Sequence, residues 1–338
     1  MHESSGHFKY DTYLKSLWRY RQVIPISSEC DLVTLGEGMT PLVELAPLEY
    51  PEHYVKLDYL CPTGSYKDRG ASVLLTHLNS LGVTEVVEDS SGNAGAAIAA
   101  YSARADIECT IYCPESTSKS KLKQISAYGA KLKLIPGNRM ATTEAIKKAA
   151  ENIPYASHNW HPFFLEGMKT LAYELTEQMS GKVPKHIICP VGFGSIYLGL
   201  YIGYRELQKM GKVDFLPRLL GVQPSVCSPI YNAYRDTLST ITRMAQIGTT
   251  LAEGITAELP VRTQMLIHAI DYTNGAFTTV DDDEIEEGMK ILAGKGLYVE
   301  PTSAVVIKAY DKFKQAGIIG EQDLTVSILT GSGLKSSS

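Results

Sequence analysis

Lys67 is the side chain best suited to covalent chemistry in the stretch 62–70, which reads PTGSYKDRG. It follows a Gly-Ser turn and begins a stretch that we expect to be helical as far as about Leu81. The positive end of a helix dipole disfavours an ammonium group, and a neutral lysine can form a Schiff base or move a proton. A surface lysine with no chemical role is the alternative interpretation of the same pattern.

Three short loops rich in glycine and small polar residues follow apolar runs, at residues 90–95, 192–195 and 330–333. Ligands of open parallel sheets bind where strands end and such loops begin. In the loop 192–195, glycines would let the backbone approach a ligand, and the following helix would present free N–H groups to an anion, most often phosphate. The dinucleotide pattern G-x-G-x-x-G is not met, because Tyr197 stands at the position of the last glycine, and no G-x-x-x-x-G-K-[ST] loop is present. A cofactor with a single phosphate therefore fits this loop better than a dinucleotide or a nucleoside triphosphate.

Short β-rich runs alternate with helical stretches along most of the chain. The predicted strands cover residues 85–89, 109–113, 131–135, 186–191, 219–222 and 325–329, and predicted helices include residues 116–128 and 142–150. This alternation predicts an α/β fold in which mostly parallel strands are covered by helices on both faces. We expect two lobes: a large one from residues 1–59 and 155–338, and a smaller, mobile one from residues 60–154.

Composition and charge exclude several classes of protein. The 338 residues are 44% hydrophobic and 20% charged, with a net charge of −5, which fits a globular protein without a basic face for nucleic acid. No apolar run reaches the roughly 18 residues of a membrane span, and the first residues lack a secretory signal. The six cysteines are dispersed and form no Cys-x-x-Cys pair, so we expect no disulfide framework and a cytoplasmic protein. His158 and His161 lack a third metal ligand at suitable spacing, so we expect no metal site.

Longer motifs resemble those of pyridoxal-phosphate (PLP) enzymes of the tryptophan-synthase β fold, called fold type II, and threonine synthases most closely. The stretches that carry the resemblance lie at residues 17–21 (LWRYR), 36–42 (GEGMTPL), 62–70 (PTGSYKDRG), 91–93 (SGN), 299–304 (VEPTSA) and 329–335 (LTGSGLK). They occur in the family's order and span nearly the whole chain. The resemblance implies a two-lobed fold of parallel-rich sheets flanked by helices, and a homodimer that acts on a small amino-acid substrate.

The resemblance also implies a role for each candidate site residue. Lys67 would hold PLP through a Schiff base and then act as the acid and base at the substrate α-carbon, while Asn93 would donate to the ring O3′. Thr330 would face the pyridine nitrogen, and a neutral hydroxyl there leaves that nitrogen largely unprotonated and favours elimination over transamination. The phosphate of PLP would be bound by Gly192, Phe193, Gly194 and Ser195. The substrate carboxylate would be held by Ser91, Gly92, Asn93 and Ala94.

Two departures from the threonine synthase pattern leave the substrate open. The loop 190–196 is one residue shorter than usual in threonine synthases and resembles that of threonine and serine dehydratases, as does the stretch 250–255 (TLAEGI). Phe164 stands where threonine synthases typically carry an Arg that grips the phosphate of O-phosphohomoserine. A charge-assisted hydrogen bond of that kind contributes about 1.5–3 kcal/mol.

The motifs and the departures support two enzymatic interpretations. The first is a threonine synthase-like lyase of amino-acid biosynthesis, which converts O-phosphohomoserine and water to threonine and phosphate. The alternative is a threonine or serine dehydratase, or a β-replacement enzyme acting on O-activated serine. A non-catalytic protein that binds an amino acid or PLP is a third interpretation, which the combination of Lys67, Asn93 and Thr330 disfavours.

Three further features have plainer interpretations. Tyr197, Tyr201 and Tyr204 recur at helical spacing and predict a packing stripe, with a dimer face as the alternative. The acidic run 281–284 predicts the N-cap and first turn of a helix. Glu253 and Glu300 are placed near the cofactor only by their positions in the chain.

Overall fold

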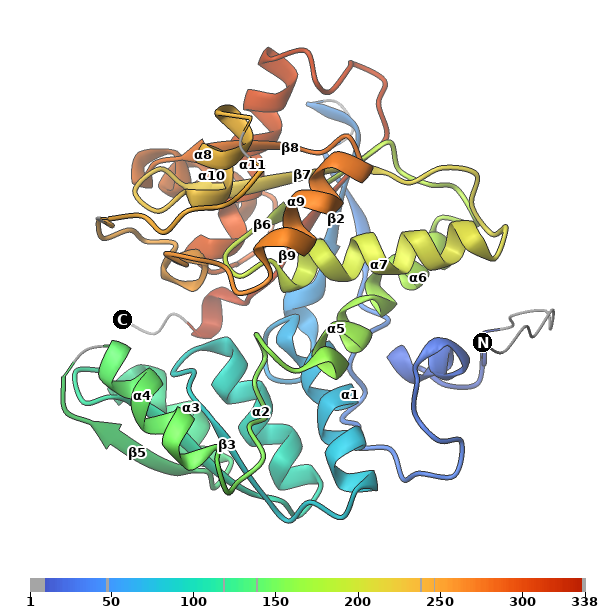
Figure 1. Ribbon diagram of the computed structural model, residues 1–338. Helices are drawn as coiled ribbons and strands as arrows, with labels where there is room; N and C mark the ends of the chain where they lie inside the picture. Colours follow the sequence, from blue (N-terminus) through green and yellow to red (C-terminus); the bar gives the residue numbers. More distant parts are fainter. Residues whose placement is uncertain are drawn as a thin grey trace.

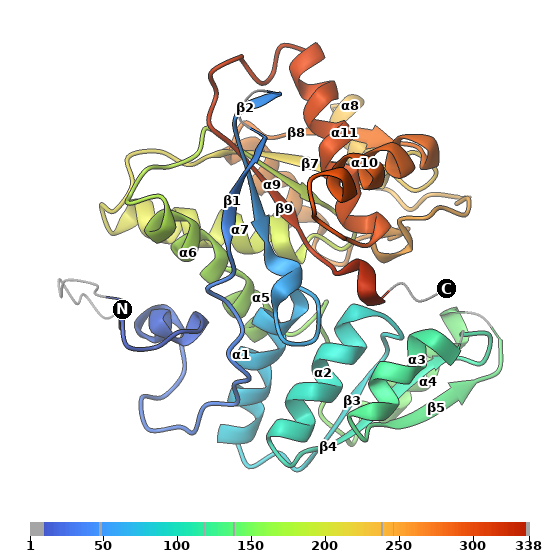
Figure 2. The same ribbon diagram turned by 180° about the vertical axis from the view of Figure 1, so that it is seen from behind.

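The protein has two lobes, each built around one β-sheet (Figure 1; Figure 2). The computed structural model describes residues 10–335 apart from 47, 48, 118, 138, 238 and 246. The six-stranded sheet has the order β1-β2-β9-β6-β7-β8, and the three-stranded sheet has the order β3-β4-β5. Within the described residues, every strand pair is parallel except the edge pair β1 and β2. The α/β fold with parallel-rich sheets is therefore confirmed.

The bounds of the elements are as follows. The larger sheet contains β1 (Leu42–Ala46), β2 (Tyr50–Leu57), β6 (His186–Pro190), β7 (Arg218–Pro224), β8 (Ala276–Val280) and β9 (Thr325–Leu329). The smaller sheet contains β3 (Glu85–Glu88), β4 (Glu108–Pro114) and β5 (Lys131–Ile135). The helices are α1 (Lys67–Ser80), α2 (Asn93–Arg104), α3 (Lys119–Ala127), α4 (Arg139–Ala149), α5 (Pro162–Met168), α6 (Thr170–Gln178), α7 (Ser195–Lys209), α8 (Pro229–Arg235), α9 (Thr263–Tyr272), α10 (Asp282–Gly294) and α11 (Pro301–Gln315). Short 3-10 helices are η1 (Leu17–Val23), η2 (Asp58–Leu60), η3 (Glu253–Ile255) and η4 (Gly333–Lys335).

All six predicted strands are present, with ends that differ from the prediction by at most two residues. The strands β1, β2 and β8 were not predicted, and the antiparallel pairing of β1 with β2 departs from the expected parallel pattern. An antiparallel pair at the edge of a parallel sheet is common, because a short hairpin can join it. The exposed pattern of β5 also corrects the expectation of continuous burial, since its lysines lie on an edge strand.

Helices cover both faces of the larger sheet. Residues of α6, α7 and α9 share one buried apolar cluster with the sheet, and residues of α10 and α11 share another. Tyr197, Tyr201 and Tyr204 are all buried in the first cluster, so the predicted packing stripe is confirmed. The predicted N-cap of α10 is also confirmed, because Asp281 and Glu284 each accept a hydrogen bond of 3.0 Å from the other's backbone N–H.

The smaller lobe has a core of its own beneath α1 and α2. That core includes four buried residues from outside the range 60–154, namely Val33, Ala156, Phe164 and Met168. Whether residues 60–154 move as one unit remains a prediction. None of the described helices is long and apolar enough to cross a membrane.

Candidate active site

The loops predicted to carry the site lie together at the ends of strands from both sheets. β6 leads into the loop before α7, β9 leads into Thr330, and β3 leads into the loop before α2. Tyr66 connects two of them, because its backbone N–H donates to Thr330 O at 3.0 Å and its hydroxyl lies 3.4 Å from Ser195 Oγ. Lys67 follows Tyr66 directly, so the backbone bond of Tyr66 holds the start of α1 beside the end of β9.

Asn93 of the smaller lobe is joined to the larger lobe through Glu300. Its Nδ2 donates to Glu300 Oε1 at 3.0 Å and to Oε2 at 3.1 Å. The Glu300 backbone N–H donates to Gly331 O at 3.0 Å, and a Cβ at residue 331 would lie 2.1 Å from Glu300 Cδ. Burial raises the pKa of the Glu300 carboxyl, while the Asn93 hydrogen bond and the charges of Lys335 and Lys67 oppose that rise. Asn93 thus lies beside the chain that follows β9.

Lys67 begins α1, and its amine lies between two aromatic rings. Its Nζ is 4.8 Å from the Tyr66 ring centroid and 5.7 Å from the Phe164 ring centroid. Phe164 is completely buried and packs on α1, where a Cβ at Gly70 would lie 2.6 Å from its ring. Among the described residues, the structure gives Lys67 Nζ neither a hydrogen bond nor an ion pair. A half-buried lysine with no such partner suits a covalent bond to an aldehyde.

Residues 192–195 form a cradle between β6 and the 15-residue helix α7. Gly194 is the N-cap with φ of +87°, and a Cβ there would lie 2.6 Å from Leu266 Cδ2. At Gly192 a Cβ would lie 2.9 Å from the Cα of Ile255. Glycine is required at both positions for the backbone to take this course. The free N–H groups and positive dipole end of α7 suit one phosphate group.

Ser91, Gly92 and Ala94 surround Asn93 at the start of the 12-residue helix α2. Gly92 is exposed, Ser91 is half-buried and Ala94 is buried, so the loop presents its backbone at the surface of the site. The N–H groups of such a helix start suit a carboxylate. The role of these residues in substrate binding stays a prediction.

The chain after β9 holds the loop before Lys67 in place. The Ser332 backbone N–H donates to Gly64 O at 3.0 Å, and Lys335 Nζ donates to Thr63 O at 2.7 Å. The last described residues lie between the two lobes, close to the start of α1 (Figure 2). Residues 330–335 and the lysine loop therefore form one structural unit.

Asp68, beside Lys67, is a buried carboxyl within that unit. It accepts hydrogen bonds from the Thr63 N–H at 2.7 Å and the Thr63 hydroxyl at 2.5 Å. Burial raises the pKa of Asp68 to about 7, although the Thr63 bonds and the charge of Lys335 act in the opposite direction. The carboxyl fixes the turn that leads into α1.

A buried ionic network anchors α1 to the larger lobe. Arg69 donates to Glu174 Oε2 at 2.8 Å and to Asp58 Oδ1 at 2.6 Å, and Lys56 forms a second ion pair with Glu174. All four side chains are completely inaccessible to solvent. The two cations hold the pKa of the Glu174 carboxyl well below its usual range. Because Thr40 N–H also donates to Glu174 at 3.0 Å, the motif 36–42 serves to position α1.

Three residues contact the predicted site residues although the sequence did not predict these contacts. Tyr66 lies within the lysine motif, and its position beside Lys67 was the only signal. Glu300 and Ser303 lie in the motif 299–304, but nothing in their spacing indicates that they touch Asn93 and Thr330.

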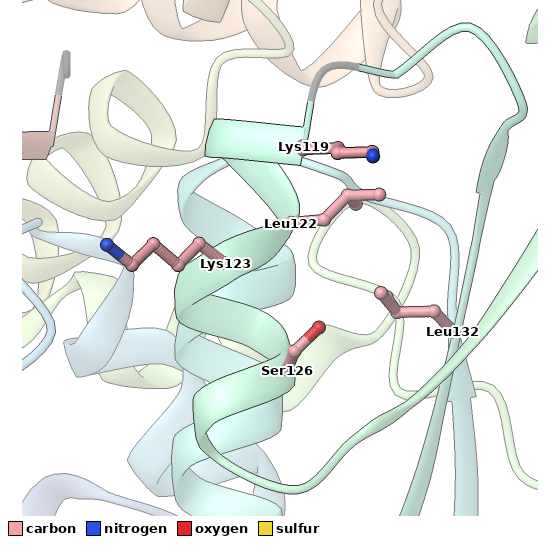
Figure 3. Close-up of a pocket in the computed structure, with 5 residues that line it drawn as sticks. All are labelled: Lys119, Leu122, Lys123, Ser126 and Leu132. Atoms are coloured by element: carbon pink, nitrogen blue, oxygen red, sulfur yellow. The ribbon is translucent and has the colours of Figure 1, made fainter.

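A separate hollow lies on the smaller lobe between α3 and β5 (Figure 3). It is lined by Lys119, Leu122, Lys123, Ser126 and Leu132, and Lys123 points to the other side of the helix from Leu122. The hollow is open and mostly apolar, and none of the predicted site residues lines it. We therefore do not include it in the site.

Comparison with known proteins agrees with this geometry. Over residues 33–331 the chain matches the family described as "Pyridoxal-phosphate dependent enzyme". Threonine synthase from Methanocaldococcus jannaschii is 38% identical over 94% of this chain and 80% of that protein, and threonine synthase from Methanosarcina acetivorans is 34% identical over 97% and 82%. The structure of serine racemase from Dictyostelium discoideum matches with a TM-score of 0.72 at 24% identity, covering 87% of this chain and 92% of that one. The chain belongs to the family of pyridoxal-phosphate dependent enzymes, with the fold type II architecture.

Within that family the protein is a PLP-dependent lyase related to threonine synthases. Its own residues fit the cofactor, since a lysine amine with no ion-pair partner among the described residues lies beside a glycine cradle at a helix N-terminus. A buried hydroxyl, Thr330, and an amide, Asn93, complete a donor set suited to a planar heterocycle with one phosphate.

Proposed function

We propose that this enzyme converts O-phosphohomoserine and water to threonine and phosphate, as a threonine synthase does. The observation that supports the proposal most is that Tyr66, which directly precedes Lys67, contacts both Ser195 and Thr330 in a chain 38% identical to a threonine synthase. Bound PLP supplies an electron sink for charge that develops at the substrate carbons.

Each part of the site has a task in this proposal. Lys67 binds the cofactor and moves a proton at the substrate α-carbon. The N–H groups of residues 192–195 bind the cofactor phosphate, Asn93 donates to the ring O3′, and Thr330 faces the pyridine nitrogen. The backbone of residues 91–94 binds the substrate carboxylate. Phe164 and Tyr66 exclude water from the amine until the substrate is bound, because their rings flank Nζ.

The reaction needs two proton removals before water adds. Lys67 takes the α-proton, a second proton leaves the β-carbon, and the γ-carbon–oxygen bond breaks to release phosphate. Water then adds at the β-carbon. One proton is returned to the α-carbon and one to the γ-carbon, which completes threonine. In this proposal Lys67, a half-buried residue, carries protons in both directions.

Product analysis with O-phosphohomoserine tests the proposal. Wild-type enzyme loaded with PLP should release phosphate and threonine in equal amounts, and Lys67→Ala should release neither. Lys133→Ala is the matched control, because Lys133 Nζ also lies over a tyrosine ring, at 4.9 Å from the Tyr112 centroid, but in the exposed strand β5. No turnover by the fully loaded wild type would overturn the proposal.

Phe164 favours a second candidate function, a threonine or serine dehydratase or a β-replacement enzyme on O-activated serine. Its ring is completely buried against α1 and brings no charge to a phosphorylated substrate. In that case Lys67 would remove the α-proton and the β-substituent would leave. Formation of keto acid from serine or threonine, or of β-replaced products, without turnover of O-phosphohomoserine, would select this function.

We also propose that the enzyme acts as a homodimer, on the basis of the family resemblance. Light scattering on the PLP-loaded protein tests this, and a mass of about one chain would contradict it.

A further inference from the structure

The side chain of Ser303 contacts four polar atoms of the chain after β9. It is the third residue of α11, and its side chain is completely buried. The Thr330 N–H donates to its Oγ at 3.0 Å, and the Gly331 N–H donates at 2.7 Å. The same Oγ lies 3.0 Å from Thr330 Oγ1 and 3.1 Å from Gly331 O.

The hydrogen-bonding capacity of a serine hydroxyl fixes the direction of these bonds. A hydroxyl has two lone pairs and one hydrogen. Both lone pairs of Ser303 Oγ are taken by the backbone N–H groups of Thr330 and Gly331, so it cannot accept a third hydrogen bond. Its own hydrogen therefore points to Thr330 Oγ1 or to Gly331 O, and the Thr330 hydroxyl cannot donate to Ser303.

The Thr330 hydroxyl hydrogen must then find an acceptor elsewhere. Among the described residues, the one hydrogen-bond contact of Thr330 Oγ1 is with Ser303 Oγ. The hydrogen of the Thr330 hydroxyl is therefore left for a ligand. Thr330 is also held by its carbonyl, which accepts from the Tyr66 N–H beside Lys67. A hydroxyl fixed in this way acts as a donor and requires an acceptor opposite it.

We propose that Ser303 is a positioning residue that makes Thr330 a hydrogen-bond donor to the pyridine nitrogen of PLP. An acceptor nitrogen has no proton of its own, so Ser303 keeps the ring unprotonated without touching it. This inference rests on the proposed place of Thr330 in the site, but not on which amino acid the enzyme converts.

Nuclear magnetic resonance of the enzyme loaded with 15N-labelled PLP tests the inference directly, because the shift of the ring nitrogen reports its protonation. Wild type should give the unprotonated shift. Ser303→Ala should move it toward the protonated value and weaken PLP binding about tenfold, the loss expected for one oriented hydrogen bond. Ser303→Thr keeps the hydroxyl and should restore both values.

Ser327→Ala is the matched control, since Ser327 is a fully buried serine of β9 whose Oγ lies 2.8 Å from His53 Nε2. It should leave the nitrogen shift unchanged. If Ser303→Ala does not fold, Ser303→Cys keeps the volume with a much weaker hydrogen-bonding group and should show the same change. An unchanged nitrogen shift in the folded Ser303 variant, or a protonated nitrogen in wild type, would overturn the inference.

Thr330→Val separates this inference from the proposed function. If Thr330→Val leaves the nitrogen shift unchanged, Thr330 does not face the nitrogen and the inference fails, whatever the substrate. If the shift responds to Ser303 and Thr330 but O-phosphohomoserine is not converted, the inference holds and the proposed reaction fails.

Discussion

Replacing Glu174 by Gln should destabilise the enzyme by about 3–5 kcal/mol, the range for breaking one side of a buried ion pair. Glutamine keeps the size of the side chain but removes the charge that Arg69 and Lys56 share. Since all three side chains are inaccessible to solvent, water cannot replace the lost partner. Arg69 lies two positions from Lys67, so PLP should also dissociate more readily from the variant.

Urea unfolding of the PLP-loaded enzyme at pH 7 measures this change. Glu258→Gln is the control, because Glu258 pairs with Arg243 at 2.7 Å while the two side chains are 46% and 61% exposed. Such a pair contributes about 0–1 kcal/mol. A loss in Glu174→Gln no larger than in Glu258→Gln would refute the role of the network.

The pH dependence has a definite sign. Arg69 and Lys56 lower the pKa of Glu174 in the folded protein below its ordinary value of 4.5. The stabilisation is therefore complete above about pH 4.5 and is lost as the pH falls through the folded pKa. Accordingly, the difference in stability between wild type and Glu174→Gln should be constant from pH 6 to 8 and shrink in acid.

Two further predictions concern the turn before α1 and the phosphate cradle. Burial raises the pKa of Asp68 to about 7, so the folded protein holds that proton after the unfolded chain has released it. Wild type should lose stability relative to Asp68→Asn by about 1.4 kcal/mol per pH unit between about pH 5 and 7 in urea titrations; a constant difference would contradict this. Gly194→Ala places a Cβ 2.6 Å from Leu266 at φ +87° and should weaken PLP binding, measured by equilibrium dialysis. Gly211→Ala is its control at φ +65° with no atom within 4 Å, and an equal loss of affinity in both would argue against the cradle.

Strands could be predicted where burial on both faces gives a continuous apolar run, as in β6 and β9. β2 could not, because its sequence YPEHYVKL includes Lys56 and His53. Both are buried only because distant residues provide partners: Glu174 for Lys56 and Ser327 for His53. The hydrophobic pattern of a strand does not indicate which distant residue will pair with a buried polar side chain.

The same limit applies to the candidate site. Glycine-rich loops after apolar strands are recognisable locally, and the family resemblance then indicated Lys67, Asn93 and Thr330. The contacts of Asn93 with Glu300 and of Thr330 with Ser303 join residues 207 and 27 positions apart. These contacts depend on how the two lobes and α11 pack, and spacing along the chain does not indicate them.

The bond between Lys335 and Thr63 joins residues that are 272 positions apart. Closing so large a loop is slow, because the ends must find each other before any contact compensates the lost chain entropy. This contact of the lysine loop can therefore form only after the chain through residue 335 has been synthesised. The turn that leads into α1 is thus completed late in the folding of this chain.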